Sequence, residues 1–238
     1  PTEAEIAEFW PVVERQLPGA TLDEARPLVV AELLRRARQQ RYAAYVEELR
    51  QRAGLDIKLP YPDLPRVDLE VSAADPSRGP ADATVTVVQF AEYQCYYCNQ
   101  VRPSLDRLFD EFDGKVRVVW KDFPLSNHGR ALPAAIAARC AGEQGQYWQM
   151  NAMLLENQHA LTDASIAGYA GDLGLDTEPF ESCLSSGRHD DAVRADMAVG
   201  EELGVRATPT FFINGVLLSG AQPYERFKAL VDRELDGA

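Results

Sequence analysis

Two cysteines three positions apart stand in the stretch F-A-E-Y-Q-C-Y-Y-C-N-Q-V-R-P, Phe90 to Pro103. Residues 84–90 form a β-branched apolar run typical of a buried strand, and residues 98–112 follow a helical pattern. A pair such as Cys95 and Cys98, placed between a strand and a helix, could hold a metal, form a structural disulfide or exchange disulfides with other molecules.

The spacing of the other ligand-type residues argues against a metal. A structural zinc site normally needs four Cys or His ligands, commonly as two close pairs. Here the other two cysteines are isolated from each other, and the three histidines are scattered: Cys140, Cys183, His128, His159 and His189. We therefore expect no metal and no other cofactor.

Disulfide exchange gives each cysteine of the pair a role. At the first turn of a helix, unpaired backbone N–H groups and the helix dipole favour a thiolate, so the pKa of Cys95 should fall below the free value of about 8.5. Cys98, one helical turn later, can attack a mixed disulfide on Cys95. This predicts Cys95 as the nucleophile and Cys98 as the resolving thiol. The alternative is a redox-inactive chaperone or binding module in which the pair is a static disulfide.

Composition excludes some functions. The 238 residues carry a net charge of −13, which would repel a phosphate backbone, so we expect no nucleic-acid partner. With 46% hydrophobic residues the chain can build a core, and no apolar run is long enough for a membrane span. The first residues do not resemble a signal peptide, and because there is no initiating Met we expect that any such peptide has been removed.

The first 65 residues predict a helical arm. A capping box, Thr2-Glu3-Ala4-Glu5, opens a helical region over residues 2–53 that we expect to be broken at Pro11 and at Pro18-Gly19. A proline-rich connector, K-L-P-Y-P-D-L-P-R at residues 58–66, follows. We place a domain boundary near Pro65.

Residues 66–238 have the mixed pattern of an α/β domain. Asn214-Gly215 is a strong hairpin-turn signal between two short apolar runs. Strands are predicted over residues 67–71, 84–90, 116–120, 210–213 and 216–219, and helices over residues 98–112, 130–203 and 223–235.

Over about residues 67–236 the sequence resembles the DsbA-like branch of the thioredoxin superfamily, the bacterial extracytoplasmic thiol-disulfide oxidoreductases. The motifs that carry this resemblance are V-T-V-V-Q-F-A-E-Y-Q-C-Y-Y-C, Pro103 five residues after Cys98, V-V-W-K-D-F-P-L-S-N-H, C-A-G-E-Q-G-Q-Y-W-Q-M and G-V-R-A-T-P-T-F-F-I-N-G. The resemblance implies a thioredoxin fold with a helical insertion at about residues 130–190, preceded here by the helical arm.

The resemblance also implies partners and a substrate site. Substrates would be proteins with thiols or disulfides, and a redox partner would re-oxidise or reduce the pair, in the periplasm or cell envelope. A cis peptide bond at Thr208-Pro209 would face the cysteines and present backbone to an extended substrate segment. We expect Tyr96, Tyr97, Thr208 and Pro209 to bind substrate.

Two departures from the family pattern bear on mechanism. Family members often carry a buried carboxylate six residues before the nucleophile, and here that residue is Gln89. Glu92 is therefore the candidate for proton transfer, and its alternative interpretation is an exposed loop acid. Tyr96-Tyr97 stands where the strongly oxidising prototype has Pro-His, so the pair should be less oxidising.

Further expectations concern the two distant cysteines, His128 and the helical arm. In an oxidising compartment, Cys140 and Cys183 would form a structural disulfide; buried free thiols are the alternative. His128 is interpreted as a surface loop residue. Because Ile6, Phe9 and the stripe from Leu22 to Leu49 give more apolar helical surface than water favours, we expect the arm to form a homodimer or to fold back on its own chain. The sequence leaves oxidase, isomerase and reductase roles open.

Overall fold

The computed structural model describes residues 1–14, 17, 19–54 and 64–237. The chain divides into two compact units, Pro1–Pro62 and Asp63–Ala238. Pro18 and most of the predicted connector at residues 58–66 lie outside the described residues.

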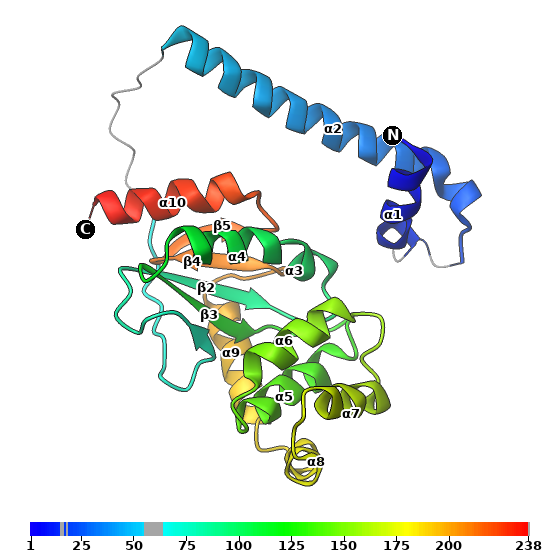
Figure 1. Ribbon diagram of the computed structural model, residues 1–238, viewed down its shortest axis with the longest axis vertical. Helices are drawn as coiled ribbons and strands as arrows, with labels where there is room; N and C mark the ends of the chain where they lie inside the picture. Colours follow the sequence, from blue (N-terminus) through cyan, green and yellow to red (C-terminus); the bar gives the residue numbers. More distant parts are fainter. Residues whose placement is uncertain (15–16, 18, 55–63, 238) are drawn as a thin grey trace. The chain divides into compact units, whose positions relative to one another are not determined.

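The first unit is a helical hairpin of α1 (Glu3–Glu14) and α2 (Leu22–Ala53), with α1 against the first part of α2 (Figure 1). Capping boxes start both helices: the Glu5 N–H donates to the Thr2 hydroxyl at 3.2 Å, and the Glu24 N–H donates to the Thr21 hydroxyl at 3.4 Å. The predicted box at the start of the chain is therefore confirmed.

The expected break at Pro11 is wrong, because α1 continues through it. Proline removes one helical hydrogen bond. In α1 that loss is offset by burial of Ile6, Phe9 and Val12, which are at most 8% exposed.

The sheet of the second unit has the order β1-β3-β2-β4-β5. Strands β2 and β3 are parallel, and the other neighbours are antiparallel. Asn214 and Gly215, with φ of 44° and 82°, form the predicted turn between β4 and β5. The strands are β1 (Ser77–Arg78), β2 (Val85–Ala91), β3 (Val116–Asp122), β4 (Thr210–Ile213) and β5 (Val216–Ser219).

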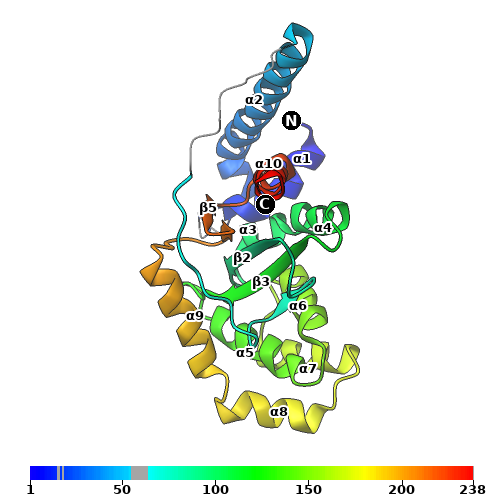
Figure 2. The ribbon, with the colours of Figure 1, turned by 90° about the vertical axis from the view of Figure 1, so that its left-hand side faces the viewer.

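The helices of the second unit either cover one of the two faces of the sheet or belong to an insertion made of α5 to α8. Figures 1 and 2 show α5 to α8 gathered apart from α4 and α10. The predicted thioredoxin-type α/β fold with a helical insertion is confirmed. The helices are α3 (Tyr96–Gln100), α4 (Arg102–Glu111), α5 (Ala131–Gly142), α6 (Tyr147–Glu156), α7 (Asp163–Asp172), α8 (Thr177–Ser186), α9 (Asp190–Glu202) and α10 (Tyr224–Asp236).

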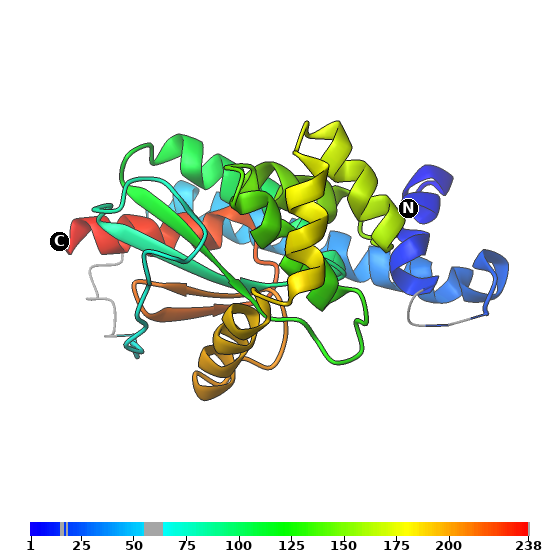
Figure 3. The ribbon, with the colours of Figure 1, turned by 90° about the horizontal axis from the view of Figure 1, so that it is seen from below.

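Each face of the sheet has its own apolar cluster. Leu105 of α4 and Phe227 of α10 pack on one face with Val87. Helix α9 lies on the opposite face (Figure 3), where a Cβ on Gly200 would come within 2.6 Å of the Phe123 ring. Only glycine allows this approach. Helix α9, Asp190–Glu202, thus covers the sheet and begins where the insertion was expected to end, near residue 190.

Two local predictions need correction. Residues 67–71 are not a strand: the Val67 N–H donates to the Gly215 carbonyl at 3.0 Å beside the bridge between Arg66 and Val216, but no ladder continues along the segment. Its apolar side chains pack on the cluster beside α9. Apolar and polar residues alternate over residues 67–71 because one side of this segment is partly buried, and not because the segment pairs with a strand. The helix predicted over residues 98–112 is interrupted at Val101, which leaves Pro103 in the first turn of α4, where its missing N–H costs little.

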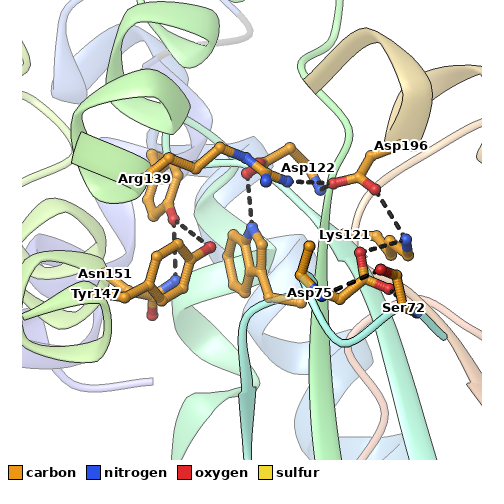
Figure 4. Close-up of polar contacts among 11 residues, drawn as sticks. Ser72, Asp75, Lys121, Asp122, Arg139, Tyr147, Asn151 and Asp196 are labelled. Carbon is orange, nitrogen blue, oxygen red and sulfur yellow. Dashed lines mark hydrogen bonds and ion pairs between the residues drawn. The ribbon is translucent and has the colours of Figure 1, made fainter. Parts of the chain in front are cut away.

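A buried charge network joins the sheet to the helices that follow it (Figure 4). Arg139 of α5 contacts Asp122 of β3 at 2.7 Å and Asp196 of α9 at 2.5 Å. Lys121 contacts Asp196 at 2.9 Å and Asp75 at 2.7 Å. Because all five side chains are at most 9% exposed, removing one cation leaves buried carboxylates unpaired.

We expect Arg139→Met to lower the free energy of unfolding by about 3–5 kcal/mol, the usual cost of breaking a buried ion pair. Denaturant unfolding would measure this. Arg194→Met is the matched control, because Arg194 is 69% exposed and 3.9 Å from Asp190; its effect should stay within about 0.5 kcal/mol. Equal losses for the two variants would contradict a structural role for the network.

Candidate active site

The end of β2 and the start of α3 hold the two cysteines. Cys95 is the N-cap of α3, and the Cys98 N–H donates to the Cys95 carbonyl at 3.0 Å. Both are free thiols, Cys95 5% exposed and Cys98 fully buried. The Cys-X-X-Cys turn thus keeps one sulfur at the rim of the site and one beneath it.

The loop before β4 lies against this turn because β4 pairs antiparallel with β2. The Thr208-Pro209 peptide bond is cis, and the Cys95 thiol donates to the Thr208 carbonyl at 3.2 Å. The Thr208 hydroxyl is buried and has no hydrogen-bond partner among the described residues. It can donate to Cys95 once that sulfur is ionised.

The two sulfurs differ in proton affinity. The Cys98 thiol, by hydrogen bonding to Cys95, lowers the pKa of Cys95 to about 7, and the Thr208 hydroxyl and Cys98 N–H assist against the opposing effect of burial. Complete burial, together with the neighbouring Cys95, raises the pKa of Cys98 well above its ordinary value. At neutral pH, Cys95 is therefore the sulfur that ionises.

Glu92 lies beside the pair and is completely buried, so it is not an exposed loop acid. One carboxylate oxygen accepts from the Gln94 N–H at 2.6 Å, and the other contacts His128 Nδ1 at 2.5 Å. Burial raises the pKa of Glu92. His128 is not a plain surface residue: its side chain is 27% exposed.

Gln89 occupies an interior position on β2. Its side chain is 3% exposed, and its Nε2 has no hydrogen-bond partner among the described residues. It lines a cavity of about 90 Å³ together with Arg102, Trp120 and Asn151. Because an amide does not titrate, this residue cannot accept a proton from the cysteines.

The two residues between the cysteines are more exposed to solvent than the sulfurs. The rings of Tyr96 and Tyr97 meet edge to face with centroids 5.4 Å apart, and Tyr97 is 40% exposed. An exposed ring beside a buried thiol can contact an incoming chain.

The insertion contributes a residue that the sequence did not identify. Gln158, after α6, donates from its Nε2 to the carbonyls of Tyr93, at 3.0 Å, and Cys95, at 2.7 Å. The Arg130 N–H donates to the side-chain oxygen of Gln94, next to Cys95 in the chain. A glutamine far along the chain gives no sequence signal of such a role.

Cys140 and Cys183 form a disulfide that joins α5 to α8, with their Cα atoms 5.8 Å apart. In the chain-entropy account, closing a loop with a sequence separation of 43 stabilises the fold by about 4 kcal/mol. His189 lies close to both sulfurs. The disulfide, however, leaves no thiolate there to bind a metal.

A family model described as thioredoxin matches residues 72–233. The chain belongs to the thioredoxin family. The resemblance inferred from the motifs is therefore confirmed. Among the described residues, no helix is both long and apolar enough to span a bilayer.

Curated relatives of this thioredoxin-family chain are much longer proteins. The match to Na(+)/H(+) antiporter NhaA 1 of Salinispora arenicola is 37% identical over 164 residues and covers 68% of the chain but 25% of the relative. Na(+)/H(+) antiporter NhaA of Herminiimonas arsenicoxydans is 35% identical, with coverage of 73% and 27%. The chain thus spans about a quarter of the length of these relatives.

Solved structures show the same fold over nearly their whole length. A thioredoxin-like oxidoreductase from Silicibacter pomeroyi has a TM-score of 0.65 at 28% identity, covering 70% of this chain and 95% of its own. BdbD from Bacillus subtilis has a TM-score of 0.63 at 22% identity, with coverage of 68% and 94%. Wolbachia pipientis α-DsbA1 also has a TM-score of 0.63 at 22% identity, covering 71% of this chain and 94% of its own. The fold is DsbA-like.

We expect the alkylation rate of Cys95 to rise with pH around a midpoint of about 7, because only the thiolate reacts. Cys98→Ala removes the strongest hydrogen-bond donor to that thiolate, so the midpoint should move up towards the free value of about 8.5. Thr208→Val should move it in the same direction by less. Iodoacetamide labelling followed by mass spectrometry measures all three. A wild-type midpoint at or above the free value would contradict the hydrogen-bond account.

Proposed function

We propose that the chain exchanges disulfides with protein substrates through Cys95 and Cys98. The observation that supports this most strongly is the pair of free, adjacent thiols with opposite pKa shifts, beside the cis Thr208-Pro209 bond. A static disulfide, as in a chaperone or binding module, would not require a lowered pKa for one of the two thiols. We further propose that residues 66–238 form the catalytic domain and residues 1–65 the arm.

The exchange proceeds in two balanced steps. The Cys95 thiolate attacks a substrate disulfide, forms a mixed disulfide and releases one substrate thiolate. Cys98 then loses its proton and attacks the Cys95 sulfur, which forms the Cys95–Cys98 disulfide and releases the second substrate thiolate. The substrate is reduced and the enzyme pair oxidised; the reverse sequence oxidises a substrate dithiol. A redox partner restores the starting state.

Substrate binding is assigned to the groups around Cys95. The backbone of Thr208 and Pro209 offers hydrogen bonds to an extended segment, as β-strand addition requires. The exposed Tyr97 ring and the half-buried Tyr96 ring add apolar contact. These groups would bind the backbone and apolar side chains of a substrate, which many proteins offer. The proposed substrates are therefore a broad range of unfolded or flexible proteins.

A pKa of about 7 for Cys95 makes the pair a mild oxidant. It matches a thioredoxin-type thiolate rather than the strongly stabilised thiolate of DsbA, whose pKa is about 3.5. We therefore favour isomerase or reductase chemistry over one-way oxidation. The Cys140–Cys183 disulfide and the 25% identity to a periplasmic thioredoxin-like protein of Salmonella enterica support an extracytoplasmic bacterial location.

With insulin as a disulfide substrate, Cys95→Ser should abolish exchange, because it removes the attacking sulfur. Cys98→Ser should accumulate a mixed disulfide, because attack continues without resolution. Electrophoresis without reductant, after acid quenching, measures the trapped species. Equal trapping by the two variants would overturn the assignment of roles, and full activity of Cys95→Ser would overturn the function itself.

The arm supports a second proposal, that the chain forms a homodimer through α2. Five large apolar side chains of α2 are exposed, and they lie within about 120° of the helix circumference, so they form one face. They are Leu28, Leu34, Tyr42, Tyr45 and Leu49. The helix continues well beyond the part that α1 covers. Arg35 and Arg38 lie among them, so the face is mixed rather than fully apolar.

Light scattering of the full chain should give twice the mass of one chain at micromolar concentration. A double variant, Tyr42→Glu with Leu49→Glu, should give the monomer mass, because charges would be buried in the apolar contact. Leu217→Glu is the matched control, since Leu217 is 55% exposed but lies on β5; it should leave the mass unchanged. A monomeric wild-type chain would favour the alternative in which the arm covers its own chain.

A further inference from the structure

Resolution of a mixed disulfide requires a proton to leave a completely buried thiol. Cys98 is 0% exposed, and its pKa is raised by burial. The position that supplies a carboxylate in many relatives is Gln89, which cannot titrate. The chain therefore needs another path between Cys98 and water.

Glu92 is close enough to both sulfurs to influence their pKa values. Its backbone N–H donates a hydrogen bond to the Cys98 sulfur, and its negative charge raises the pKa of both Cys98 and Cys95. The carboxylate is completely buried, but no Lys or Arg among the described residues pairs with it. A buried carboxylate without a fixed cation is costly, which argues against a purely structural role.

His128 connects this carboxylate to the outside. It belongs to the loop after β3, where its N–H donates to the Leu125 carbonyl at 2.9 Å and its carbonyl accepts from the Ala131 N–H at 3.0 Å. Those two bonds fix the backbone on both sides of the ring. Nδ1 contacts the Glu92 carboxylate at 2.5 Å, and the side chain is 27% exposed, so the ring lies between the buried acid and solvent.

We propose that Glu92 and His128 form a proton relay that carries the Cys98 proton to water during resolution. This inference rests on the proposed disulfide exchange and adds its proton path. The carboxylate takes the proton from the Cys98 thiol as that sulfur attacks Cys95. The proton passes to the imidazole, whose other side releases one to water, and the departing substrate thiolate is protonated by solvent.

The groups around Glu92 allow this transfer. The titratable neighbours are Cys95 and Cys98 in the active-site turn and His128 in the loop after β3, and Gln94 contributes its N–H. Arg130 is two residues after His128, but its guanidinium is bonded to the Leu161 carbonyl and to Asp163. It therefore does not replace the histidine as the partner of the carboxylate.

An aromatic disulfide, dithiobis-nitrobenzoate, separates the two steps in the full-length protein with its Cys95–Cys98 pair reduced. Attack by Cys95 releases the first coloured thionitrobenzoate ion, and resolution by Cys98 releases the second. We expect His128→Ala and Glu92→Gln to slow the second release about a hundredfold at neutral pH, the usual effect of losing a positioned proton acceptor. The first release should be unchanged in His128→Ala and no slower in Glu92→Gln, because removing the negative charge lowers the pKa of Cys95.

Two readouts distinguish proton transfer from support of the fold. Added imidazole should restore the second release in His128→Ala, and raising the pH should restore it in both variants, because hydroxide then deprotonates Cys98 directly. His159→Ala is the control, since His159 is exposed and is assigned no role at the site; both of its phases should match the wild type.

A normal second release in either variant would overturn the relay. So would slowing of both releases without rescue by imidazole, which would indicate a structural role. A faster second release in Glu92→Gln would show that the carboxylate only repels the Cys98 thiolate, and would also overturn it. Failure of the proposed function looks different: the wild-type protein itself would then release no second thionitrobenzoate.

Discussion

The hydrogen bond between the two sulfurs is the interaction on which the site depends. Burial alone would hold both protons in place, because a thiolate is poorly solvated away from water. Donation from the Cys98 thiol lowers the pKa of Cys95, and the neighbouring Cys95 adds to burial in raising the pKa of Cys98. This difference suits the proposed roles of Cys95 as attacking sulfur and Cys98 as resolving sulfur. The arrangement requires a turn that stacks one cysteine on the next and a strand loop, at Thr208, that closes over the outer one.

The helical insertion serves this geometry as well as enlarging the fold. Gln158 holds the carbonyl of Cys95 from the insertion side, and Arg139 fixes α5 to both β3 and α9. The Cys140–Cys183 disulfide ties α5 to α8 behind them. The active-site turn is therefore contacted both by the strand loop at Thr208 and, through Gln158, by the cross-linked insertion.

The sequence predicted those parts that depend on local pattern. Apolar β-branched runs placed β2 and β3 correctly, Asn214-Gly215 located the hairpin, and the cysteine spacing located the site. The features that the sequence did not predict depend on which distant segments pack against a given residue. Residues 67–71 alternate because one side is buried, although no strand pairs with them. The environments of Glu92, His128 and Gln158 are created by segments far apart in the chain, and no spacing rule brings those together.

We propose that Cys95 and Cys98 form a reversible redox pair distinct from the Cys140–Cys183 disulfide. The direct measurement equilibrates the full chain in glutathione buffers of graded ratio, quenches with acid, alkylates the free thiols and locates them by peptide mass spectrometry. We expect Cys95 and Cys98 to become labelled together along one two-electron titration curve, while Cys140 and Cys183 stay unlabelled until strongly reducing conditions. A Cys95–Cys98 pair that fails to titrate, or that is reduced only together with Cys140 and Cys183, would contradict it.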